Sequence, residues 1–133
     1  MAGSDVAASA LLADDETALL RRALLEWGGP ARCGDQLAVG MGFESERDLL
    51  DQCSRLRRAL ADDVPLAPVD WARILLAVEI VFVSDLVGTG FEWPTTTGRS
   101  DETTIKSLRS IQRKLGKTVR PYYGGTPSDA GNE

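Results

Sequence analysis

Four acidic side chains in the second half of the chain have the type that moves protons or binds divalent metals: Glu79, Asp85, Glu92 and Asp101. Carboxylates serve as general acids, as general bases and as ligands of hard cations. The spacing of these four matches no ligand or acid–base motif. The chain also has no histidine, which removes the usual general base at neutral pH and the Ser-His-Asp and Cys-His hydrolases. We therefore expect no catalytic residues and no enzyme activity.

The glycines and cysteines indicate no cofactor. Gly88-Thr89-Gly90 lacks the rest of a dinucleotide fingerprint, and the chain contains no Walker loop. Cys33 and Cys53 are the only cysteines. Two thiols without histidine do not make a zinc site, and a disulfide framework normally needs more cysteines, so we expect reduced thiols. The sequence predicts no metal and no cofactor.

Glu79 lies in the most apolar part of the chain, and an ionised carboxylate there must be paired, protonated or directed into a cavity. We expect a buried ion pair with Arg73, or with an arginine of another helix. Loss of one partner of such a pair would cost roughly 3–5 kcal/mol. A role of Glu79 in binding a partner, or less readily in catalysis, stays open at this point.

Six residues are predicted to contact a partner: Phe91, Trp93, Arg99, Lys106, Arg109 and Arg113. Large rigid aromatic side chains supply binding energy at a small cost in entropy. The loop before Ser100 also has the hydroxyls and the arginine of an anion site, although Asp101 and Glu102 oppose one. The alternative for Trp93 is that it fills the core beneath this loop.

Residues 37–49 resemble the core of helix-turn-helix proteins, in particular the spacing found in the AraC-type family. The residues that match are Ala38, Gly42, Phe43, Ser45 and Leu49. The resemblance implies two crossing helices and a DNA-binding function. However, the positions that would face the groove include Glu46, Asp48 and Asp51, which repel phosphate.

The elements that must position these residues are all helices. Caps, glycine stops and apolar spacing predict a compact all-α bundle of about five helices, at approximately 14–27, 35–41, 45–61, 68–87 and 100–116. The helix from Pro68 to Val87 is the most apolar and is predicted to be central. We expect residues 1–13 to be flexible or frayed, residues 14–120 to form one domain, and residues 121–133 to be a disordered tail.

The charge distribution and the length of the chain limit the classes of function that are possible. The chain has 133 residues, and residues 1–98 hold 16 acids and 8 bases, whereas all charges in the predicted last helix region, 103–120, are positive. The longest apolar run is too short to cross a membrane, and no signal peptide is apparent. We expect a non-enzymatic protein-interaction module of a bacterial cytoplasm that binds another protein or itself. The alternative is a nucleic-acid-binding regulator that uses residues 35–60 or the basic helix 103–120.

Overall fold

The computed structural model describes residues 4–124, and this part of the chain is helical. The α-helices are α1 (Ala8–Leu11), α2 (Asp14–Glu26), α3 (Asp35–Gly40), α4 (Glu46–Ala61), α5 (Pro68–Val83), α6 (Trp93–Thr97) and α7 (Asp101–Val119). Two 3₁₀ turns, η1 (Gly90–Glu92) and η2 (Arg120–Tyr123), complete the order. Extended pairing within residues 4–124 is limited to isolated bridges, such as Val6 with Leu66. The all-α prediction is therefore confirmed.

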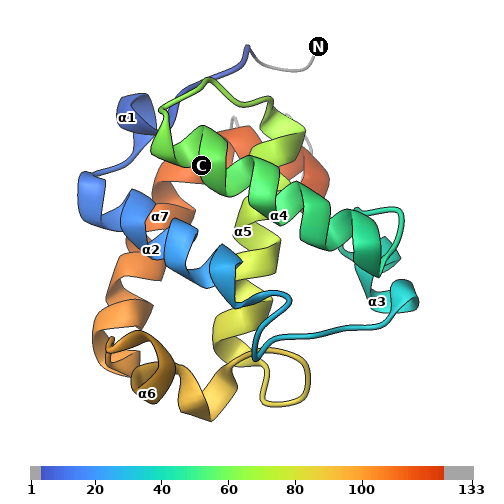
Figure 1. The fold of residues 1–133 in the computed structure, drawn as a ribbon. Helices are drawn as coiled ribbons and strands as arrows, with labels where there is room; N and C mark the ends of the chain where they lie inside the picture. Colours follow the sequence, from blue (N-terminus) through green and yellow to red (C-terminus); the bar gives the residue numbers. More distant parts are fainter. Residues whose placement is uncertain (1–3, 125–133) are drawn as a thin grey trace.

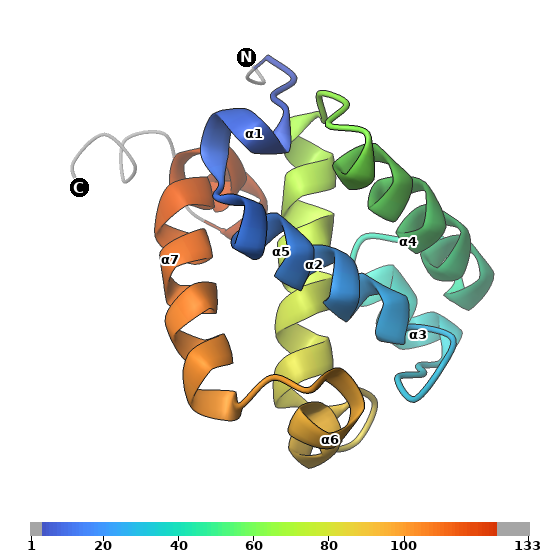
Figure 2. The ribbon, with the colours of Figure 1, turned by 60° about the vertical axis from the view of Figure 1, so that its left-hand side comes forward.

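Helix α5 is the centre of the bundle, as predicted. Pro68 begins it at a position where the missing N–H costs no hydrogen bond. Helices α2, α4 and α7 surround α5 (Figures 1 and 2). Nine of its residues are buried, including Trp71 and Ile74, and the wide apolar surface needed for this position explains the near absence of polar residues.

The neighbouring helices bury narrower stripes. In α4, the predicted stripe of Leu49, Cys53, Leu56 and Leu60 is buried, and the Ser45 side chain accepts a hydrogen bond from the Asp48 N–H at 3.0 Å. In α2, Leu20 and Leu24 are buried, and Trp27 directly after the helix is buried too. These stripes pack α2 and α4 against α5.

Helix α5 ends at Val83, four residues before the predicted end. The Ser84 hydroxyl accepts hydrogen bonds from the N–H groups of Leu86 and Val87 at 3.1 Å, which replaces helical bonding. The Thr89 N–H then bonds to the Val81 carbonyl at 2.8 Å, so the chain turns back against the helix. The local serine bonds outweigh the apolar character of Leu86 and Val87.

The segment 88–99, expected to be a loop, contains η1 and α6. Gly90 has a φ of +53°, and a Cβ atom there would overlap Asp85. Only glycine fits this close approach without strain. The turn allows Trp93 to enter the core.

Helix α7 continues past its predicted end at Gly116 to Val119. A glycine costs a helix only about 1 kcal/mol relative to alanine, and burial of Val119 opposes that cost. Glycine alone therefore did not define the end of this helix.

The two ends of the described chain also differ from expectation. Residues 4–13, expected to be frayed, include α1 and the buried residues Ala8 and Leu12, because this segment pairs with the chain at Leu66. Residues 121–123, assigned to the tail, belong to η2 and contact α5. The rest of the two terminal predictions, for residues 1–3 and 125–133, lies outside the described residues. No helix between residues 4 and 124 is long and apolar enough to cross a membrane.

Candidate functional site

One side of α5 is not fully covered by the other helices. It presents Val69, Arg73, Leu76, Glu79 and Val83, none of which is fully buried. Because these residues recur every three or four positions, they share one side of the helix. We call this surface, together with the residues that line its two cavities, the α5 groove.

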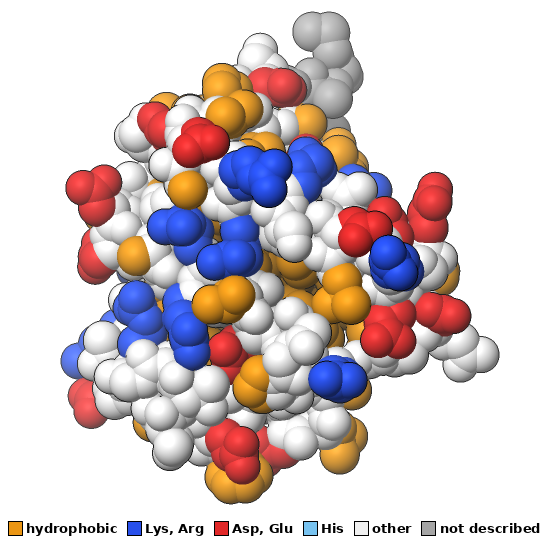
Figure 3. Space-filling model, in the orientation of Figure 1, with side chains coloured by type: hydrophobic (Ala, Val, Ile, Leu, Met, Phe, Trp, Pro, Cys, Tyr) orange, Lys and Arg blue, Asp and Glu red, His pale blue; other side chains and the backbone are white. Residues whose placement is uncertain are grey.

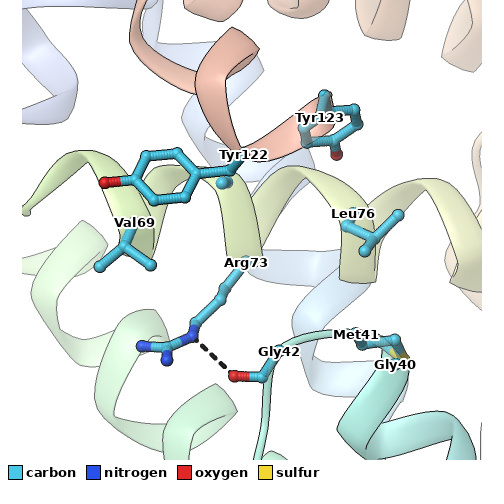
Figure 4. A pocket seen from close by; sticks show the side chains of 9 residues that line it. Gly40, Met41, Gly42, Val69, Arg73, Leu76, Tyr122 and Tyr123 are labelled. Atoms are coloured by element: carbon cyan, nitrogen blue, oxygen red, sulfur yellow. Dashed lines mark hydrogen bonds between the residues drawn. The ribbon is translucent and has the colours of Figure 1, made fainter. Parts of the chain in front are cut away.

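The first cavity lies at the N-terminal half of α5 and has a volume of about 400 Å³. Val69, Arg73 and Leu76 form its floor, Met41 lies on one side, and Tyr122 with its neighbour Tyr123 lies on the other. Figure 4 shows the two tyrosines on one side of α5 and the Gly40–Gly42 turn on the other. The lining is mostly apolar, as in pockets that bind apolar side chains or ligands.

The second cavity lies at the C-terminal half of α5 and has a volume of about 260 Å³. Glu79 and Val83 of α5 face Ile105, Leu108, Arg109 and Gln112 of α7 across it. Val83 is 70% exposed and Ile105 is 39% exposed. The boundary between the two cavities is a hydrogen bond of 2.8 Å, which Tyr123 of the first cavity donates to Glu79 of the second.

The predicted ion pair between Glu79 and Arg73 is wrong. Residues six positions apart on a helix are separated by about 9 Å along its axis, and only residues three or four apart are neighbours. The half-buried Glu79 carboxylate instead accepts hydrogen bonds from Gln112 Nε2 at 2.7 Å and from the Tyr123 hydroxyl at 2.8 Å. No lysine or arginine of the described chain lies within ion-pair distance of Glu79.

The two donors to Glu79 have further contacts of their own. Gln112 Oε1 accepts a hydrogen bond of 3.4 Å from Arg109, so an arginine polarises the amide that donates to Glu79. Withdrawal of the Tyr123 hydroxyl from solvent and its contact with Glu79 raise the pKa of Tyr123. Tyr123 therefore stays protonated at neutral pH and acts as a donor.

Arg73 connects α5 to the turn after α3. Its Nε donates to the Gly42 carbonyl at 3.0 Å, and its Nη1 lies 3.5 Å from Asp70 (Figure 4 shows the first contact). The guanidinium carbon also lies 5.8 Å from the centre of the Phe43 ring, within the range of a cation–π interaction. Arg73 thus joins the floor of the first cavity to the turn on one side of it.

The predicted contact residues of α7 fall on one side of that helix. Lys106, Arg109 and Arg113 are exposed and recur at three- and four-residue spacing. Arg109 lines the second cavity, while Lys106 forms an exposed ion pair with Glu102 at 3.4 Å. The structure therefore brings part of the predicted basic surface to the groove.

The aromatic residues predicted for the same surface separate. Phe91 is 75% exposed on η1, but Trp93 is 0% exposed and donates its indole N–H to Thr104 at 2.8 Å. Trp93 also packs edge-to-face on Phe82 with ring centres 5.5 Å apart. The prediction that Trp93 contacts a partner is therefore wrong, and the core alternative holds. Arg99 is half-buried in the turn before α7.

Helices α3 and α4 have the local shape expected from the helix-turn-helix resemblance. Ala38, Phe43 and Leu49 are buried where the two helices meet, and Gly42 has a φ of +97° at the turn. The Asp48 carboxylate accepts a hydrogen bond from the Glu44 N–H at 3.0 Å at the start of α4. The matching residues therefore have folding roles.

Sequence reasoning missed the tyrosines and Met41 of the first cavity. Tyr122 and Tyr123 follow a proline in a segment rich in glycine, and this composition predicted a tail. The signal that was available is the stripe on α5 itself: Val69, Arg73, Leu76 and Val83 recur at helical spacing and include the only arginine of the helix. An arginine in such a stripe indicates a surface that reaches solvent.

The α5 groove can hold apolar groups on both sides of one anionic hydrogen-bond acceptor. Within residues 4–124, no group of three or more cysteine or acidic side chains is arranged to hold a metal ion. Comparisons of the chain with protein-family models, with curated proteins and with solved structures found no match.

Proposed function

We propose that the protein is a non-enzymatic interaction module, an adaptor or regulator of a bacterial cytoplasm, that binds a helical segment of another protein in the α5 groove. The segment carries apolar side chains at three- and four-residue spacing, with one lysine or arginine among them. Helix-in-groove binding of this kind is a common mode of peptide recognition.

The observation that carries the proposal is the set of partners around the Glu79 carboxylate. Its carboxylate accepts hydrogen bonds from two neutral donors, Gln112 and Tyr123, and no cation of residues 4–124 lies within 4 Å of it. A cationic side chain in the groove would donate a further, charge-assisted hydrogen bond to the Glu79 carboxylate. A cation seated between the apolar walls would be partly withdrawn from water, which strengthens such a contact.

The shape of the site favours an extended ligand over a small compact one. The two cavities follow α5 from Val69 to Val83 and are separated by the contact between Tyr123 and Glu79. A helix laid along this surface would place one apolar side chain in each cavity and a basic side chain between them. A small molecule would fill only one cavity.

The proposal is tested by selection of ligands from a displayed library of random peptides, followed by measurement of their affinity through fluorescence anisotropy. We expect the selected peptides to share a basic residue flanked by apolar residues at helical spacing. Glu79→Gln keeps the shape of the side chain and removes its charge, and it should weaken binding about tenfold, or 1.4 kcal/mol.

A matched pair of valine substitutions provides the control. Val83→Ser changes a groove residue and should weaken the same peptides, whereas Val39→Ser changes an exposed valine of α3 and should not. The proposal is wrong if the library yields no binders, or if the binders ignore both Glu79→Gln and Val83→Ser. Self-association that is lost in Val83→Ser would instead identify a second copy as the occupant.

A further inference from the structure

A second surface, made by α2 and α4, concentrates arginine side chains. Arg21 of α2 lies at the seam with Arg57 of α4, whose Nε donates to the Arg21 carbonyl at 3.3 Å. Arg58 follows directly on α4 and is exposed. Figure 3 shows lysine and arginine side chains gathered over these two helices on one face of the molecule. We call Arg21, Arg57 and Arg58 the arginine cluster.

The three side chains of the arginine cluster form no ion pair with the described residues. The Nε of Arg21 is buried without a hydrogen-bond partner, a condition that costs free energy. The neighbouring arginines have ion pairs: Arg22, whose Nε is also buried without a hydrogen-bond partner, pairs with Glu26 at 3.4 Å, and Arg55 pairs with Asp70 at 2.8 Å. In a chain with 20 acids and 15 bases, unpaired arginines in one place indicate an anionic partner.

A hollow with both apolar and polar lining adjoins the cluster. Its volume is about 410 Å³, and Arg57 lines it together with Leu24, Leu25, Trp27 and Leu50 of the seam between α2 and α4. Leu25 is an exposed leucine. In Figure 3 hydrophobic side chains lie in a recess beside the basic residues. A ligand here can therefore offer an apolar group and an anionic group side by side.

We propose that the arginine cluster and its hollow bind an acidic segment of a partner protein, with a leucine-like side chain in the hollow and carboxylates on Arg57 and Arg21. Arginine suits this role because its planar fork can hold a carboxylate through two hydrogen bonds. The surface lies on helices other than those of the α5 groove walls, and the inference does not depend on the proposed function.

The surrounding charges favour a peptide over a nucleic acid. Asp14 and Asp63 line a cavity with Arg21, and Asp51 and Asp62 line another with Arg58. A phosphate backbone that extended beyond the cluster would approach these carboxylates, and its affinity depends on the number of phosphates neutralised. A short acidic segment centred on Arg57 meets fewer of these aspartates, because the hollow that Arg57 lines has no acidic residue.

The test measures binding of a fluorescent peptide of leucine and glutamate residues to the full chain by anisotropy. Two further probes are a peptide with glutamine in place of glutamate and a single-stranded oligodeoxynucleotide of similar length. We expect the glutamate peptide to bind, the glutamine peptide to bind at least about tenfold more weakly, and the oligonucleotide to bind more weakly than the glutamate peptide.

Matched arginine substitutions on one helix locate the binding. Arg57→Gln should weaken the glutamate peptide about tenfold, whereas Arg47→Gln, an exposed arginine at the other end of α4, should not. Arg21→Gln is a second cluster variant, and circular dichroism checks that each variant is folded. Val83→Ser should leave this binding unchanged, so that failure of the α5 groove and failure of this surface are distinguishable.

The proposal is overturned by absence of binding of the glutamate peptide, by equal binding of the glutamine peptide, or by binding that survives both Arg57→Gln and Arg21→Gln. Preferential binding of the oligonucleotide would also overturn it and would make the cluster a nucleic-acid surface.

Discussion

The carboxylate of Glu79 is held by two neutral side chains, and this changes the expected cost of losing it. A buried ion pair would leave an unpaired charge behind, at roughly 3–5 kcal/mol. Here the partners are Gln112 and Tyr123, and Glu79 is only half-buried. Both partners can turn to water when the carboxylate is absent.

We therefore predict that Glu79→Ala lowers the free energy of unfolding by about 1–2 kcal/mol, the usual value of one or two hydrogen bonds. Urea denaturation measures this free energy. The control is Glu92→Ala, which removes an exposed acid and should stay within about 0.5 kcal/mol of wild type. A loss above about 3 kcal/mol would mean that Glu79 neutralises a buried cation after all.

The same contact makes Tyr123 a reporter of the groove. Tyr122 and Tyr123 are the only tyrosines of the chain, so the Tyr122→Phe variant has a single phenol that ultraviolet absorbance can titrate. Its pKa is raised by burial and by Glu79. We predict that adding Glu79→Gln lowers this pKa towards the ordinary value, because the adjacent negative charge is gone. An unchanged titration would show that Tyr123 does not contact Glu79 in solution.

Among the elements, α2 and α7 are joined by polar contacts at their buried boundary. Glu16, almost fully buried, accepts hydrogen bonds of 2.6 Å from Lys114 Nζ and from the Ser110 hydroxyl, and also caps α2 through the Ala13 N–H at 2.8 Å. Burial alone raises the pKa of Glu16, but these bonds together outweigh it and leave the pKa below its ordinary value. The ionised form is thus the one that stabilises the fold.

We predict that Lys114→Met lowers the free energy of unfolding by about 1–2 kcal/mol at neutral pH, less than for a fully buried pair because Lys114 is partly exposed. A group with a lowered pKa stabilises the fold above its unfolded pKa, here 4.5, and this stability is lost as the pH falls through the folded pKa. The difference in the free energy of unfolding between variant and wild type, measured by urea denaturation, should therefore be smaller at about pH 3 than at neutral pH. Lys117→Met, exposed on the same helix, is the control, and a pH-independent difference would contradict the argument.

At the scale of the whole molecule, the reactivity of the two thiols measures how well the core is protected from solvent. Cys33 and Cys53 are buried, and burial raises the pKa of Cys53 to about 12. Only the thiolate reacts with alkylating agents. Both thiols belong to one core. We therefore expect both to become exposed in the same unfolding transition.

We predict that iodoacetamide modifies Cys53 of the native protein at least about a hundredfold more slowly than that of the urea-unfolded protein, because few molecules are open and few thiols are ionised. Mass spectrometry against time measures it, and the unfolded chain is the control. Rapid modification of Cys53 in the native state would show that α4 separates from the core without global unfolding.

The sequence predicted the main helices well because apolar spacing, Pro68 and the Ser45 cap act locally. It did not predict α1, α6 or η2, whose short lengths make them dependent on packing. For the site, Glu79, Arg73 and Arg109 were identified as notable, but their partners were not. Partners such as Tyr123 and Gln112 lie 44 and 33 positions from Glu79, and no local pattern specifies such distances.

The contacts of Glu16 also bear on how the chain acquires its structure during synthesis. Ser110 and Lys114 lie 94 and 98 positions after Glu16, so both bonds close loops that include most of the described residues. Closing loops of this length costs conformational entropy, and only the packing of the complete core offsets that cost. A ribosome that has not yet made α7 therefore carries a chain in which one side of the apolar helix α5 is still uncovered. Until its last long helix emerges, the nascent protein should be a substrate for chaperones.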